Sequence, residues 1–154
     1  MARYLIVANQ TLGGAHLDAA IHERLTAGPG EFFVVVPMIL LEYESSVWVS
    51  LDPVFGIAAA ATATPEAVAD ARELSEHRLQ QMIRRIELVG GTATGEVGDT
   101  DPVLAVRTVL DRESFDEVLV STLPSGLSRW LKLDLPSRIS RMVDISVTTI
   151  EART

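Results

Sequence analysis

The sequence predicts an α/β protein built on one parallel sheet of five strands, with helices on both faces. Short apolar runs alternate with amphipathic stretches along the whole chain, and glycine or proline stands at most of the boundaries. Alternation of this kind is typical of parallel strands joined by right-handed helical crossovers. The length of 154 residues is enough for a single core. We therefore expect one domain over residues 1–154.

The N-terminal half supplies two strands and two helices. Residues 3–9 and 31–37 are apolar runs bounded by polar or turn residues, as buried parallel strands are. Residues 13–27 carry apolar residues at helical spacing and stop at a glycine-proline-glycine turn. A long helix opens at Thr64-Pro65, where a capping residue precedes proline, and ends at Gly90-Gly91. Its apolar stripe consists of Val68, Ala71, Leu74, Leu79, Met82, Ile83 and Ile86.

Residues 38–62 form an atypical apolar insertion that fits no regular element. A segment of this length inside a compact domain usually has a function or some structure of its own. Glu42, Glu44 and Asp52 interrupt its apolar residues. Because charged side chains are costly inside a bilayer, we expect no membrane span here.

The C-terminal half continues the alternation. Residues 92–97 make a weak third strand, which we expect near a sheet edge. A helix begins at Asp101-Pro102, a second pairing of a cap with proline. Residues 116–121 form the fourth strand and residues 145–151 the last one. The apolar residues expected to face inward from the helix are Val103, Leu104, Val106, Val109 and Leu110.

The last helical segment spans residues 127–142. We expect it to break near Asp134-Leu135-Pro136, because proline removes a backbone donor and clashes with the preceding turn. Trp130 lies in this segment and is expected to pack in the core or at an interface.

Composition argues against several classes of function. The net charge of −8 disfavours nucleic acid as a partner. The absence of cysteine excludes disulfides and thiolate metal sites. Residues 1–8 lack the basic head and long apolar stretch of a signal peptide. We therefore expect a cytoplasmic protein with neither nucleic-acid nor membrane partners.

A ligand is expected at the carboxyl ends of the strands, at the point where strand order reverses. This rule selects Asn9-Gln10-Thr11, Pro37-Met38, Gly98-Asp99 and Ser121 to Arg129. The last of these segments offers serines, a glycine and an arginine near a helix start, and helix starts favour anions. The alternative is that its small residues only make turns. The candidate cofactor-binding residues are Asn9, Gln10, Pro37, Met38, Gly98, Ser121, Thr122, Ser125, Gly126, Ser128 and Arg129.

Catalytic and metal-binding signatures are missing from the sequence. His16, His22 and His77 lack metal-ligand spacing, and the first two are expected on solvated faces. Neither a nucleophile elbow, a Walker loop nor a dinucleotide fingerprint is present. We expect no catalytic residues and no metal site.

The element order and the C-terminal part of the chain resemble the universal stress protein family. Residues 95–151, which run from GEVGDTDPVLAV to DISVTTIE, carry most of the likeness. The resemblance implies a Rossmann-like sheet in the order 3-2-1-4-5, related to the adenine nucleotide α-hydrolase fold. It also implies a homodimer through the last strand. Members of the family divide into adenine-nucleotide binders and non-binders.

The nucleotide-binding motif of the family is altered in this chain. Binders carry G-x2-G-x9-G-[ST] after the fourth strand, and its glycines fall on Ser121, on Pro124 and near Leu133-Asp134. Gly126 to Arg129 matches residues within the x9 portion, and Asn9 replaces the family's aspartate after the first strand. Glycine lets a backbone approach phosphate closely, whereas proline supplies no N–H. We therefore expect weak binding of AMP, ATP, phosphate or sulfate, or none.

Three functions stay open on the sequence alone. The one we favour is a non-catalytic regulatory or stress-response protein that binds nucleotide weakly or not at all and acts on an unknown protein partner. The second is an adenine-nucleotide or small-anion binder that uses the modified loop after the fourth strand, with residues 38–62 as a lid. The third is an enzyme of the wider nucleotide-binding α/β class, whose signatures are absent here.

Overall fold

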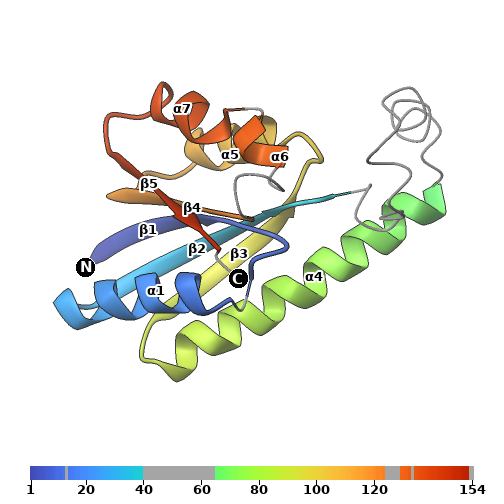
Figure 1. Ribbon diagram of the computed structural model, residues 1–154. Helices are drawn as coiled ribbons and strands as arrows, with labels where there is room; N and C mark the ends of the chain where they lie inside the picture. The colour runs from blue at the N-terminus through green and yellow to red at the C-terminus, as the bar shows by residue number, and fades with distance from the viewer. Residues whose placement is uncertain (13, 40–64, 124–128, 133, 153–154) are drawn as a thin grey trace.

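The protein is an α/β sandwich around one parallel sheet (Figure 1). The computed structural model describes residues 1–12, 14–39, 65–123, 129–132 and 134–152. The five strands lie in the order β3-β2-β1-β4-β5, which confirms the predicted fold and strand order. The elements are β1 (Ala2–Val7), α1 (Ala15–Ala27), β2 (Gly30–Pro37), α4 (Pro65–Leu88), β3 (Thr92–Gly98), α5 (Pro102–Leu110), β4 (Glu117–Thr122), α6 (Arg129–Lys132), α7 (Leu135–Ser140) and β5 (Ser146–Glu151).

Helices cover both faces of the sheet. Figure 1 shows α1 and α4 on one face and α5, α6 and α7 on the other. Successive residues of a strand point to opposite faces, so Ile6 of β1 packs with the core under α1 and α4, while Leu5 and Val7 pack under α5 and α7. Trp130 belongs to this second core, as the sequence predicts.

The central strands are apolar along their length because both of their faces are covered. Ile6 of β1 stands beside Val34 of β2 and Leu119 of β4, and all three side chains are fully buried. Burial of one such side chain contributes about 1.5–3 kcal/mol. The weaker, more polar β3 lies at the edge of the sheet, in agreement with the prediction.

The helix α5 begins at the cap that the sequence predicts. One carboxylate oxygen of Asp101 accepts hydrogen bonds from the N–H groups of Val103 and Leu104, and Pro102 follows the cap. The prediction that Leu104 faces inward is wrong, since its side chain is 44% exposed. The buried face contains Pro102, Val103, Ala105, Val106 and Val109, and Leu104 falls outside that stripe.

The C-terminal helical segment is divided, as predicted. α6 ends at Lys132, and α7 starts at Leu135 after Asp134, which has left-handed backbone angles (φ 56°, ψ 39°). These angles do not fit a right-handed helix, so the helical conformation is interrupted between the two short helices. The insertion expected at residues 38–62 lies outside the described residues, apart from Met38 and Ile39.

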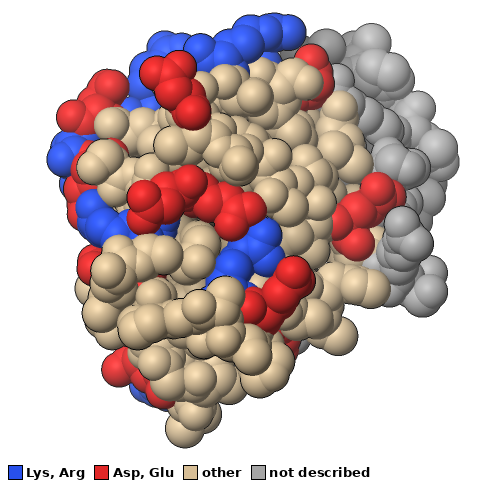
Figure 2. Space-filling model, turned by 90° about the vertical axis from the view of Figure 1, so that its left-hand side faces the viewer, with Lys and Arg blue, Asp and Glu red and all other residues tan. Residues whose placement is uncertain are grey.

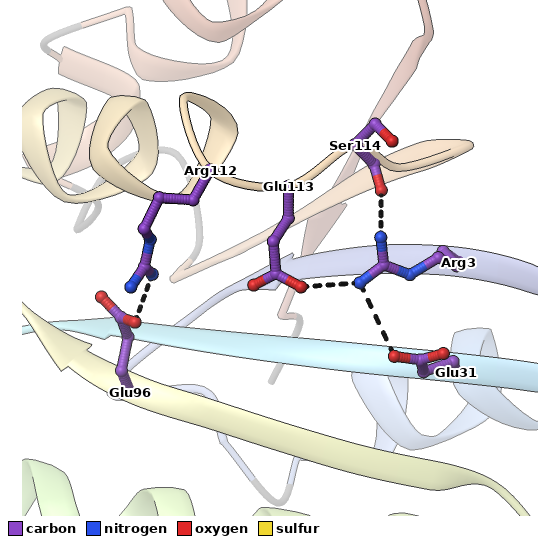
Figure 3. A network of polar contacts seen from close by, with 6 residues as sticks. All are labelled: Arg3, Glu31, Glu96, Arg112, Glu113 and Ser114. Atoms are coloured by element: carbon purple, nitrogen blue, oxygen red, sulfur yellow. Dashed lines mark hydrogen bonds and ion pairs between the residues drawn. The ribbon is translucent and has the colours of Figure 1, made fainter.

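Charged side chains join the amino ends of the strands. Arg3 of β1 contacts Glu113 at 2.7 Å, Glu31 of β2 at 3.6 Å and the carbonyl oxygen of Ser114 at 2.7 Å (Figure 3). The hydrogen bond from Arg3 to Glu113 raises the pKa of this guanidinium. Figure 2 shows acidic and basic side chains next to one another over this end of the molecule. The network fixes the start of β1 against β2 and the loop before β4.

No helix in the described part of the chain is both long enough and apolar enough to span a bilayer.

Candidate functional site

The predicted site lies where β1 and β4 end. These strands are neighbours, and the chain continues from β1 to β2 on one side and from β4 to β5 on the other. Strand order therefore reverses between them, which is where open parallel sheets bind ligands. Among the described residues of β1, β4 and the loops that follow them, the buried polar side chains are Asn9, Thr11, Ser121 and Thr122.

Asn9 is bonded to two other elements. Its Nδ2 donates to the carbonyl oxygen of Pro37 at 2.7 Å and to Oγ of Ser75 at 3.3 Å. Its Oδ1 accepts from Nη1 of Arg78 at 2.6 Å. An amide nitrogen carries two donors, and both are directed at protein acceptors. Asn9 thus links the ends of β1 and β2 to α4 and is 1% exposed.

Two hydroxyl groups join the loop after β1 to the end of β4. Oγ1 of Thr11 and Oγ of Ser121 lie 2.6 Å apart, and either can be the donor. Thr11 belongs to the segment that the strand-end rule selects, but it is not among the candidate residues, and its contact with Ser121 was not predicted. The hydroxyl of Ser121 is therefore paired within the protein.

Thr122 differs from its neighbours. Its carbonyl oxygen accepts from the N–H of Ala152 at 2.8 Å, which fixes the end of β5. Its Oγ1 is buried and has no hydrogen-bond partner in the described part of the chain. An unpaired buried hydroxyl costs free energy, which makes this atom a candidate contact for a ligand.

The other candidates contribute mainly to local structure. Gln10 is exposed in a turn. The N–H of Met38 donates to the carbonyl oxygen of Gly98 at 3.3 Å, and Met38 is buried. A Cβ at Gly98 would lie 2.6 Å from Cβ of Ala105, so glycine here admits α5 against the sheet. The structure therefore gives Gly98 a packing role.

The modified loop after β4 falls mostly outside the described residues. Ser125, Gly126 and Ser128 lie in the part that is not described. Arg129 is the first residue of α6, and its side chain is also outside the described part. The structure brings together Asn9, Pro37, Ser121 and Thr122 from the predicted set.

Two residues of α4 complete the site and were not predicted. Ser75 and Arg78 both contact Asn9, and Ser75 is 1% exposed. The sequence signal was a serine in the apolar stripe of the helix, with an arginine three residues later on the same side. A polar residue on a buried stripe needs a hydrogen-bond partner, and this rule could have predicted that Ser75 contacts a polar group.

The chemistry available here is hydrogen bonding. Hydroxyl and amide groups meet at the ends of β1 and β4, and Arg78 adds a positive charge beside Asn9. Across the described residues, no group of three or more His, Asp and Glu side chains is placed to hold a metal ion.

Three solved structures that are similar to this one all belong to universal stress proteins. A universal stress protein family member from Burkholderia pseudomallei matches with a TM-score of 0.57 and 14% identity, over 97% of this chain and 95% of the other. The universal stress protein from Archaeoglobus fulgidus matches with a TM-score of 0.53 and 11% identity, over 97% and 93%. The structure of the Archaeoglobus fulgidus protein in complex with dAMP matches with a TM-score of 0.50 and 13% identity, over 97% of both chains.

The chain has the fold of the universal stress proteins. This confirms the likeness expected from residues 95–151 and extends it over nearly the whole chain. The sequence itself matches no family model and no curated protein. The universal stress fold places the ends of β1 and β4 at the reversal point, so the contacts of Asn9, Thr11 and Ser121 lie where the strand-end rule puts a ligand.

Proposed function

We propose that this is a non-catalytic regulatory protein of the universal stress type that binds adenine nucleotides weakly or not at all. The observation that carries the proposal is the bonding of Asn9, which stands at the position of the family's aspartate. Both of its amide donors are used by Pro37 and Ser75, and Arg78 donates to its oxygen. A ligand would have to break these buried hydrogen bonds to use Asn9, at about 1–3 kcal/mol for each group left unpaired.

The altered phosphate loop supports the same proposal. Ser121 and Pro124 replace two motif glycines, and the hydroxyl of Ser121 is paired with Thr11. A Cβ at each position limits how closely a phosphate can approach the backbone. The polar groups described at the ends of β1 and β4 are hydroxyls and an amide, which are poor general bases, so the proposal includes no ATP hydrolysis.

A second candidate function rests on Thr122. Its Oγ1 is buried without a partner in the described part of the chain, and one solved neighbour of this fold is in complex with dAMP. Both observations favour an adenine-nucleotide or small-anion binder that uses the modified loop after β4.

Calorimetric titration with ATP and Mg²⁺ separates the two functions. The proposal predicts a dissociation constant no tighter than about 100 μM for the unmodified protein. Thr122→Val keeps the shape of the side chain and removes its hydroxyl, and Thr94→Val on the exposed side of β3 is the matched control. A constant below about 10 μM that weakens in Thr122→Val, and not in Thr94→Val, would establish the second function instead.

The proposal also covers assembly and location. We place the protein in the cytoplasm as a homodimer that contacts its partner along β5. That strand is at an edge of the sheet and its residues are half-buried or exposed. Unprotected edge strands tend to be paired or covered, and the absence of cysteine fits a reducing compartment.

A further inference from the structure

A pocket of about 270 Å³ lies apart from the groups at the end of β4. It opens between the loop after β1 and the helix α4. Its volume is slightly below the range of about 300–1,000 Å³ that is typical of small-molecule sites, so only a small ligand would fit. The lining residues are Leu12, Arg78, Gln81, Met82, Arg84 and Arg85.

The helical period explains why these side chains meet. Arg78, Gln81, Met82 and Arg85 follow one another at i, i+3, i+4 and i+7, so they share one side of α4. Arg84 comes three residues after Gln81 and extends the same side. α1 lies on the same face of the sheet as α4, and the ion pair of Arg85 with Asp18 crosses from one helix to the other (Figure 1).

Three guanidinium groups in one pocket are unusual in a chain of net charge −8. None of the described residues that line the pocket is acidic. Asp18 neutralises part of the charge through Arg85, and Arg78 donates a hydrogen bond to the amide oxygen of Asn9. Arg84 is exposed and has no hydrogen-bond or ion-pair partner among the residues that the structure describes. Positive side chains that line one pocket repel one another, so an anion between them would stabilise the arrangement.

We propose that this pocket binds a compact polyanion that carries phosphate groups, of the size of pyrophosphate. Arg84 and Arg85 would hold the phosphate oxygens, because guanidinium presents a fixed fork of donors that matches phosphate. The amide of Gln81 adds a neutral donor, and Leu12 and Met82 form an apolar wall. Arg78 also donates to Asn9, so the pocket borders the end of β1.

The test is a titration of ¹⁵N-labelled protein with inorganic pyrophosphate, followed by amide chemical shifts. We expect saturable shifts at Leu12, Gln81 and Arg84. Arg84→Gln should weaken binding about tenfold or more, because it removes one charge-assisted contact. Arg72→Gln is the matched control, since it removes the same exposed charge from α4 outside the pocket and should leave the affinity unchanged.

A parallel titration with ATP identifies the source of the phosphate. If ATP shifts the same amides and its binding depends on Arg84, the ligand is the phosphate tail of a nucleotide. If only pyrophosphate shifts these amides, the ligand is a free polyphosphate. The proposal is overturned if the shifts do not saturate at millimolar pyrophosphate, or if Arg72→Gln weakens pyrophosphate binding as much as Arg84→Gln does. Shifts confined to residues 121–132 would also overturn it.

Discussion

Asn9 is the residue on which the account of the site depends most. Its amide nitrogen donates to the carbonyl oxygen of Pro37, which an ionised carboxylate at this position could not do. The amide of Asn9 therefore forms a structural link between β1, β2 and α4. Thr11 and Ser121 make a second link beside it.

Replacement of Asn9 should destabilise the fold. Asn9→Ala leaves the Pro37 carbonyl and the Ser75 hydroxyl without this donor and removes an acceptor from Arg78. We expect a loss of about 2–4 kcal/mol in the free energy of unfolding, measured with urea. Gln10→Ala, an exposed change in the same loop, should cost no more than about 0.5 kcal/mol. Equal losses in the two variants would show that the bonds of Asn9 are not structural.

Among the contacts between elements, those of Glu117 connect three of them: β4, α1 and β5. Its carboxylate receives two hydrogen bonds from Arg24 of α1, both 2.9 Å long, and one from the hydroxyl of Thr148 of β5 at 2.6 Å. The hydrogen bond from Arg24 is the main cause that lowers the pKa of Glu117. The same contact raises the pKa of Arg24. The start of β4 is thus tied to a helix on one side and to the edge strand on the other.

This link should make stability depend on pH on the acid side. Because the pKa of Glu117 is lower in the folded state than its ordinary 4.5, the contribution is present above pH 4.5 and is lost as pH falls through the folded value. Glu117→Gln should lower the free energy of unfolding at pH 7 by about 1 kcal/mol, and by less at pH 3. Urea unfolding at both pH values checks this. Glu87→Gln, an exposed change on α4, should have a smaller effect that does not follow this pattern.

The cap of α5 gives a second prediction for an element. Asp101→Ala removes the acceptor for the N–H groups of Val103 and Leu104 and should cost about 1 kcal/mol. Asp111→Ala removes the same side chain from the other end of the helix, where a negative charge is unfavourable. Thermal unfolding should therefore show a lower Tm for Asp101→Ala alone. A Tm lowered equally by both changes would contradict the capping role.

Periodicity and turn residues predicted the elements well, whereas contacts between distant residues were not accessible. Pro136 indicated the break between α6 and α7, and Asp101-Pro102 indicated the start of α5, because each acts on its own neighbours. The contacts of Asn9 with Ser75 and Arg78 span 66 and 69 positions. They depend on how α4 packs against the sheet, which no local pattern specifies. The prediction that Leu104 lies on the buried face was wrong, because nothing in the local sequence indicates that an apolar residue beside a buried stripe is exposed.

At the scale of the whole molecule, the two edges of the sheet differ. α4 packs closely against β3, whereas β5 has contacts mainly with β4 and α7. The alternating Val, Thr and Ile residues of β5 carry little charge before Glu151. Edge strands without such protection tend to associate, so β5 is the surface that we expect a second copy to cover.

Sedimentation should show a dimer at micromolar concentration. Thr149→Lys places a charge on an exposed position of β5 and should shift the protein to monomers. Thr94→Lys makes the same change at an exposed position of β3 on the opposite edge and should leave the dimer intact. If the unmodified protein sediments as a monomer, the assembly through β5 is wrong.

The most direct test of the central claim is a crystal structure of the protein soaked with millimolar ATP and Mg²⁺. The account predicts that Asn9 keeps its hydrogen bonds to Pro37, Ser75 and Arg78 and that no adenine ring lies over the ends of β1 and β4. Density for an adenine ring at that position, with Asn9 turned toward it and its bond to Pro37 broken, would contradict the account.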